Sequence, residues 1–120
     1  MICTKDQLVK GIQEFLNEDI VPGIQDKPLK MALYAITQFP GMIQEVIEKP
    51  TARIVLQESD GQYDLDQMHS AFAAALDKFG SFPITINPIP FIIPSQVQIN
   101  LNRADLDSLI RHVERVVTYG

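Results

Sequence analysis

The chain has 120 residues, of which 46% are hydrophobic and 21% are charged, values typical of one globular domain spanning residues 1–120. Ten basic and fifteen acidic residues give a formal net charge of −5, which disfavours binding to nucleic-acid phosphates or to an acidic membrane surface. Cys3 is the only cysteine, so an internal disulfide is excluded. Neither a signal peptide nor an apolar run of the roughly 18 residues that span a bilayer is visible, so we expect a cytoplasmic protein.

The N-terminal segment predicts an amphipathic helix. Thr4 and Gln7 have the spacing of a capping box, so the helix is expected to begin at Thr4. We expect it to end before Pro22-Gly23, because this pair breaks helical backbone. Its apolar residues recur at helical spacing: Leu8, Ile12, Phe15 and Leu16.

A second helix is expected to open near Asp26, with Pro28 in its first turn, where the missing backbone N–H costs nothing. Its predicted apolar face consists of Leu29, Ala32, Leu33 and Ile36. Pro40-Gly41 interrupts this pattern, which resumes with Ile43, Val46 and Ile47. Residues 28–49 therefore form either one broken helix or two helices.

The middle of the chain predicts a strand, a turn and a helix. Residues 51–57 are few and rich in β-branched side chains, which is typical of a strand, and Asp60-Gly61 indicates a turn. The next helix is expected to begin after Asp64 or Asp66 and to end at Gly80, a good left-handed cap. Its predicted apolar face consists of Leu65, Met68, Phe72, Ala75, Leu76 and Phe79.

Residues 81–102 are the most distinctive stretch, with ten large apolar residues, four prolines and no charge. Apolar and polar residues alternate on both sides of a proline-rich centre, which predicts two half-buried strands joined by a loop. The loop contains Ile89, Phe91, Ile92 and Ile93, and a soluble protein rarely leaves such a cluster in water. Two interpretations stay open: the loop completes the core, or it is an interface with another copy or a different protein.

Asn102 is expected to cap a last helix that buries Leu106, Leu109, Ile110, Val113 and Val117. Together these elements predict an α+β fold. About four helices would pack on one face of a small antiparallel sheet, built from residues 51–57 and the C-terminal proline-rich hairpin.

The polar residues of the last helix include the components of a nucleophilic triad. Asp105, Ser108 and His112 share one side of the helix by their spacing. A triad needs its serine at a sharp turn beside backbone oxyanion donors, which successive helical turns do not offer. The pattern therefore favours a solvated polar face.

A second group, Asp60, Asp64, Asp66 and His69, could in principle hold a metal ion. The spacing does not match a calcium loop, because the glycine comes too early and no closing glutamate follows. Turn and helix-capping roles explain the carboxylates without a metal.

Cys3 near a helix start could be an activated thiol, but no histidine is close in sequence, so an unreactive cysteine is favoured. The sequence thus indicates no metal and no cofactor.

Three short segments resemble small proteins encoded by phages and prophages of Gram-positive bacteria. The segments are Phe15-Leu16 through Ile20-Val21-Pro22, residues 60–68 (DGQYDLDQM) and residues 102–109 (NRADLDSL). The resemblance implies a role in a phage structural or assembly module, implies no enzymatic activity, and transfers no site residues.

The leading hypothesis is a non-enzymatic interaction or assembly protein. In this interpretation Ile89, Phe91, Ile92 and Ile93 contact a protein partner or another copy of the chain, since large apolar groups at a patch centre dominate binding. The alternative is a small enzyme, or a ligand- or metal-binding domain, that uses Asp66, His69 or His112.

Overall fold

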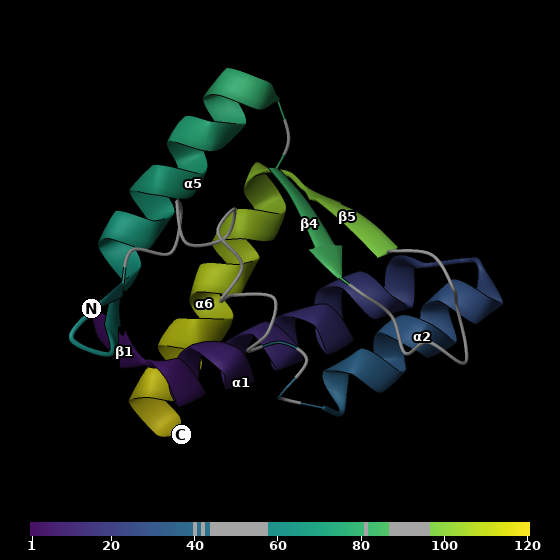
Figure 1. The fold of residues 1–120 in the computed structure, drawn as a ribbon, viewed down its shortest axis with the longest axis horizontal. Coiled ribbons are helices and arrows are strands. Elements are labelled where there is room, and N and C mark those ends of the chain that lie inside the picture. The colour runs from purple at the N-terminus through teal and green to yellow at the C-terminus, as the bar shows by residue number, and fades with distance from the viewer. Residues whose placement is uncertain (40, 42, 44–57, 81, 87–96) are drawn as a thin grey trace.

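The computed structural model describes residues 1–39, 41, 43, 58–80, 82–86 and 97–120, and in this part the protein has an α+β fold (Figure 1). Four α-helices are defined from end to end: α1 (Lys5–Phe15), α2 (Lys27–Thr37), α5 (Leu65–Phe79) and α6 (Arg103–Tyr119). The strands are β1 (Ile2–Thr4), β2 (Glu58–Ser59), β3 (Gln62–Asp64), β4 (Phe82–Ile86) and β5 (Val97–Leu101). None of the helices in the described part is both long and apolar enough to cross a bilayer.

The described strands form two small antiparallel sheets, where the sequence analysis expected one. One sheet has the order β1-β3-β2 and the other consists of β4 and β5. The expected strand at residues 51–57 lies outside the described residues. Strands β1, β2 and β3 were not expected, because segments of two or three residues are too short to show an alternating pattern.

Helix α1 begins as expected, but the helical backbone continues further than predicted. The Thr4 hydroxyl accepts from the Gln7 N–H at 3.3 Å, and the Gln7 side chain accepts from the Thr4 N–H at 2.9 Å, which confirms the capping box. A π-helical turn (Leu16–Ile20) and a 3₁₀ turn (Val21–Gly23) follow α1 directly. Pro22 lies in the first turn of the 3₁₀ segment, where its missing N–H disrupts no helical hydrogen bond.

Helix α2 starts next to Asp26, as expected. The Asp26 carboxylate accepts from the Leu29 N–H at 3.0 Å, and Ala32 and Leu33 are fully buried. The helix ends at Thr37, whose hydroxyl donates to the Tyr34 carbonyl at 2.6 Å. The sequence allows either one broken helix or two helices over residues 28–49. The part after α2 lies mostly outside the described residues.

The turn at Asp60-Gly61 is confirmed, and it joins β2 to β3. Asp60 has φ of 55° and Gly61 has φ of 75°, so both residues are left-handed, as a two-residue hairpin turn requires. Strand β1 pairs with the other edge of β3, with Cys3 opposite Tyr63. This pairing holds the N-terminus beside the start of α5.

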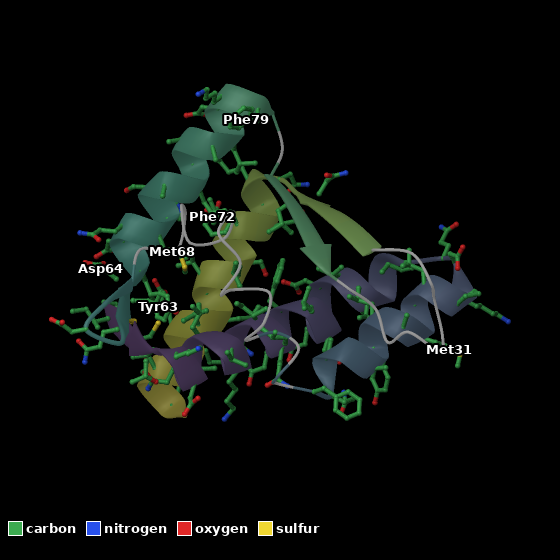
Figure 2. All side chains as sticks on the ribbon, in the orientation of Figure 1. Met31, Tyr63, Asp64, Met68, Phe72 and Phe79 are labelled. Atoms are coloured by element: carbon green, nitrogen blue, oxygen red, sulfur yellow. The ribbon has the colours of Figure 1, made fainter. Side chains whose placement is uncertain are left out.

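Helix α5 has the expected ends but a shorter apolar face. The Asp64 carboxylate caps the first turn, and Gly80 closes the last turn at φ of 78°. Figure 2 shows Met68 and Phe72 on the side of α5 that faces α6, where both are buried. Phe79 was expected on this buried face, but it is 69% exposed because it lies one turn beyond Leu76, the last buried residue of the helix.

Strands β4 and β5 are paired as expected from their alternating pattern, with Phe82 opposite Leu101 and Ile86 opposite Val97. The strand pair contacts α5 through β4 and α6 through β5. The connection, residues 87–96, lies outside the described residues.

Helix α6 is the centre of the core, since it packs against both α1 and α5. Leu106, Leu109, Ile110 and Val113 are buried as expected, whereas Val117 is only partly buried. Gly11 of α1 lies close against Val113 of α6, where a methyl group in place of the Gly11 hydrogen would lie 2.6 Å from Val113 Cγ2.

Candidate functional site

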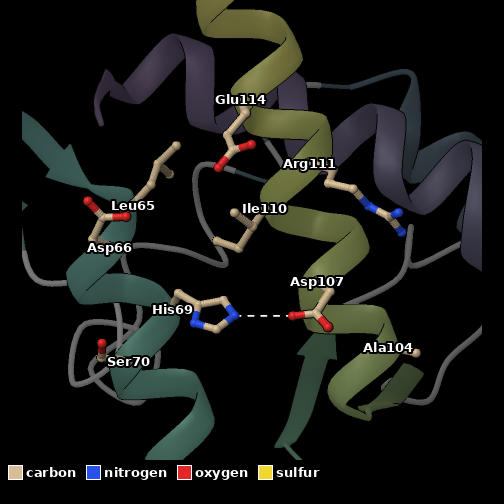
Figure 3. Close-up of a pocket in the computed structure, with 9 residues that line it drawn as sticks. All are labelled: Leu65, Asp66, His69, Ser70, Ala104, Asp107, Ile110, Arg111 and Glu114. Atoms are coloured by element: carbon tan, nitrogen blue, oxygen red, sulfur yellow. Dashed lines mark hydrogen bonds and ion pairs between the residues drawn. The ribbon is translucent and has the colours of Figure 1, made fainter.

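An open groove of about 610 Å³ lies between α5 and α6 (Figure 3). Its charged and polar lining residues are Asp66, His69, Ser70, Asp107, Arg111 and Glu114. The side chains of Asp64 and Asn102 fix the first turns of the two helices, and these turns set the register of the lining residues. The groove contains Asp66 and His69, two of the three residues named in the alternative hypothesis.

His69 and Asp107 face each other across this groove. His69 Nε2 lies 3.1 Å from Asp107 Oδ1; the His69 side chain is half-buried and the Asp107 side chain is exposed. A carboxylate that orients an imidazole is the usual arrangement of a general base. Figure 3 shows Ser70 pointing away from the pair, as expected for the next residue on a helix, so Ser70 is not placed as a nucleophile.

The carboxylates that precede His69 in the sequence are not gathered around it. Asp64 accepts the N–H groups of Asp66 and Gln67 as a helix cap, and Asp66 Oδ2 lies 3.2 Å from the N-terminal amino group of Met1. Among the described residues, no group of three or more His, Cys, Asp and Glu side chains is arranged to hold a metal ion.

His112 lies on another side of α6, facing α1 and the π-helical turn. It is only 4% exposed, so the expectation of a solvated polar face is wrong for this residue. Its Nε2 atom lies 3.3 Å from Asp19 Oδ2 and 3.6 Å from Glu18 Oε2, and its Nδ1 atom lies 3.9 Å from Glu14 Oε2. The Nδ1 atom is buried and forms no hydrogen bond with any of the described residues.

Asp105, Ser108 and His112, whose spacing matches the components of a triad, have different roles. Asp105 accepts from the Asn102 N–H and belongs to the capping box of α6. The Ser108 hydroxyl donates to Asp19, which also faces His112. In a nucleophilic triad the histidine accepts the serine proton, whereas here the carboxylate accepts it. The geometry therefore supports a structural polar cluster and not a serine nucleophile.

Sequence reasoning missed the carboxylates of this cluster: Glu14, Glu18 and Asp19. Glu14 is in the last turn of α1, and the π-helical turn that follows carries Glu18 and Asp19 toward α6. The signal in the sequence was three acidic residues within six positions at the end of a predicted helix. Their partner His112 lies almost 100 residues later in the sequence, and the spacing of the three acidic residues does not identify it.

Cys3 lies in β1 and is almost fully buried. Burial raises the pKa of the Cys3 thiol to about 11, against the smaller opposing effect of the N-terminal amino group. The thiol is therefore protonated at neutral pH, and a protonated thiol is a poor nucleophile and a poor metal ligand.

The four residues predicted to form an interface, Ile89, Phe91, Ile92 and Ile93, lie outside the described residues. The strands on either side of them are described, and the last pair before the loop is Ile86 with Val97.

Comparison with known proteins found no matching family model, no similar curated protein and no similar solved structure.

Proposed function

We propose that this protein is a non-enzymatic interaction or assembly protein, of the phage-related kind that its sequence resembles. It binds a protein partner, or a second copy of itself, through Ile89, Phe91, Ile92 and Ile93 in a proline-rich hairpin loop. A cytoplasmic setting belongs to the proposal, because the one cysteine is unpaired.

The observation that supports this proposal is the register of β4 and β5. Ile86 pairs with Val97, so the two antiparallel strands that flank residues 87–96 in the sequence are paired up to those residues. Those ten residues carry no charge and include three prolines, which limit the conformations of the loop before it binds. Large apolar groups displayed on a restricted loop favour a specific protein contact.

The test is a double substitution, Phe91→Ser with Ile92→Ser. We expect association to be lost while the thermal midpoint stays within a few degrees of the parent. Association is measured by light scattering behind size exclusion over a wide range of concentrations, followed by capture from the source cell. A matched control is Phe79→Ser, because Phe79 is an exposed aromatic residue on another element and its loss should not change association.

Two outcomes contradict the proposal. Loss of folding in the double variant, with Phe79→Ser still folded, would mean that the loop completes the core. A mass near 13.5 kDa at every concentration, together with no captured protein, would exclude both kinds of partner.

A second candidate function is ligand or metal binding in the groove between α5 and α6, and the His69–Asp107 pair favours it. Zinc, manganese and calcium are titrated while the thermal midpoint is followed. A rise that disappears in His69→Gln supports this candidate. Equal midpoints with and without each ion exclude its metal-binding form.

A further inference from the structure

The exposed face of α2 combines apolar side chains with positive charge. Lys27, Lys30, Met31 and Tyr34 are exposed, and their spacing of i, i+3, i+4 and i+7 places them on one face of the helix. Met31 is 67% exposed and Tyr34 is 52% exposed, although Ala32 and Leu33 on the opposite face are fully buried. Figure 2 shows Met31 on the outer side of α2, away from the body of the molecule.

The two lysines outnumber the one carboxylate beside them, the exposed Asp26 at the start of α2, so this face is net positive whereas the chain as a whole is negative. Helix α2 contains two lysines and no acidic residue. The formal charge of the whole chain is −5, so the remainder of the chain carries −7. Within the described part of the chain, neither Lys27 nor Lys30 forms an ion pair with Asp or Glu, and both residues are exposed.

We infer that this α2 face docks an acidic amphipathic segment of a protein partner, a helix or strand in which Asp or Glu flanks large apolar residues. The partner's apolar side chains would cover Met31 and Tyr34, and its carboxylates would pair with Lys27 and Lys30. Tyrosine and methionine are enriched at interfaces, and flanking charges set the orientation and the salt dependence of binding. This inference rests on the proposed function, because it takes the protein to act by binding another protein.

The charge pattern favours a protein over an anionic membrane as the occupant. Membrane-surface helices carry several lysines or arginines on their polar face and bury a wide apolar face in the lipid. Helix α2 has two lysines, and its more apolar side already packs in the core. The negative charge on the remainder of the chain would oppose approach to an anionic bilayer.

The experiment uses a synthetic helical peptide with Leu and Phe on one face and Glu beside them. A second peptide has Lys in place of every Glu. Binding to the full chain is measured by fluorescence anisotropy at low and high salt, and vesicles containing phosphatidylserine are tested separately. We expect the Glu peptide to bind, the Lys peptide not to bind, and salt to weaken the complex.

Two double variants test the residues of the face. K27E with K30E should weaken binding of the Glu peptide at least about tenfold and should create binding of the Lys peptide, because the charge complementarity is reversed. M31S with Y34S should weaken binding by about 30-fold, the effect of losing one strong apolar contact. The matched control is K78E with F79S, which alters an exposed lysine and aromatic pair on α5 and should change nothing.

The inference is overturned if the Glu peptide does not bind, or if both peptides bind equally. It is also overturned if the chain binds vesicles and neither peptide, since a membrane would then be the occupant. The same holds if K27E with K30E dissociates an oligomer of the chain itself, since a second copy would then be the occupant.

The variant F91S with I92S separates this inference from the proposed function. If this variant still binds the Glu peptide but loses its cellular partner, both stand; if it keeps that partner and the peptide binds, only the α2 inference stands.

Discussion

Replacing Gly11 by alanine tests the packing of α1 against α6. The added Cβ atom would lie 2.6 Å from Val113 Cγ2 and 2.9 Å from Val113 Cα, where carbon atoms in contact are normally about 3.5–4.0 Å apart. A rotation of the valine side chain could relieve the first contact. The second involves backbone, so the two helices must move apart by several tenths of an ångström, which disturbs the core between them.

The expected cost follows from two opposing effects. Overpacking of a core costs about 1–3 kcal/mol, and the close backbone contact places Gly11→Ala near the upper end. Alanine favours helical backbone over glycine by about 1 kcal/mol, which offsets part of this cost. We therefore expect the free energy of unfolding to fall by about 2 kcal/mol, or several degrees in the thermal midpoint.

The free energy of unfolding is measured by urea denaturation monitored by circular dichroism. We expect the slope of this free energy against urea concentration to be the same in the variant and the parent. Gly23→Ala is the matched control, because nothing lies within 4 Å of a Cβ atom there and its backbone is not left-handed. We expect the control to lie within about 0.5 kcal/mol of the parent. If Gly11→Ala is as stable as the parent, the close contact between the helices does not exist.

Three further changes test the helix cap, the buried thiol and the buried histidine. Asp64→Ala removes the acceptor for two backbone N–H groups of α5 and should cost about 1 kcal/mol in the same urea assay; an unchanged midpoint would mean that the cap is not formed. Because burial raises the pKa of the Cys3 thiol from 9.0 to about 11, the folded state keeps a proton that the unfolded state loses in this interval. Stability should therefore fall as pH rises from 9 to about 11, and Cys3→Ala should show a smaller fall; identical pH profiles would contradict the burial of the thiol. His112→Ala should cost about 3 kcal/mol, since it leaves a cavity and removes the group between the carboxylates; a loss below about 1 kcal/mol would show that the ring is not in the core.

The candidate sites show how much of a site can be predicted from the spacing of residues along one helix. The sequence names His69 as a candidate site residue, but its partner Asp107 lies 38 positions later and belongs to a different helix. His112 was assigned to a polar face because its neighbours at helical spacing are Asp105 and Ser108. Its burial depends on Phe15 and the carboxylates that the π-helical turn brings against α6, and no pattern within α6 contains that information.

The sequence by itself determined where the helices begin, where α5 ends, and the position of the tight turn. Capping at Thr4, Asp64 and Asn102, and the left-handed backbone at Asp60-Gly61 and Gly80, depend on residues within three or four positions of one another. Capping hydrogen bonds and the steric limits on the backbone act between residues that are close in sequence. Helix caps and tight turns therefore do not depend on where the segment packs in the fold.

Only the tertiary structure decided which faces are covered and which edges are paired. Strand β1 exists because Cys3 meets Tyr63, sixty residues later, and α1 approaches α6 closely because Gly11 meets Val113. Phe79 continues the apolar pattern of α5 yet is exposed, because the pattern extends one turn beyond the last buried position of that helix. Burial is a property of two surfaces, and the spacing of residues along one helix or strand describes only one of them.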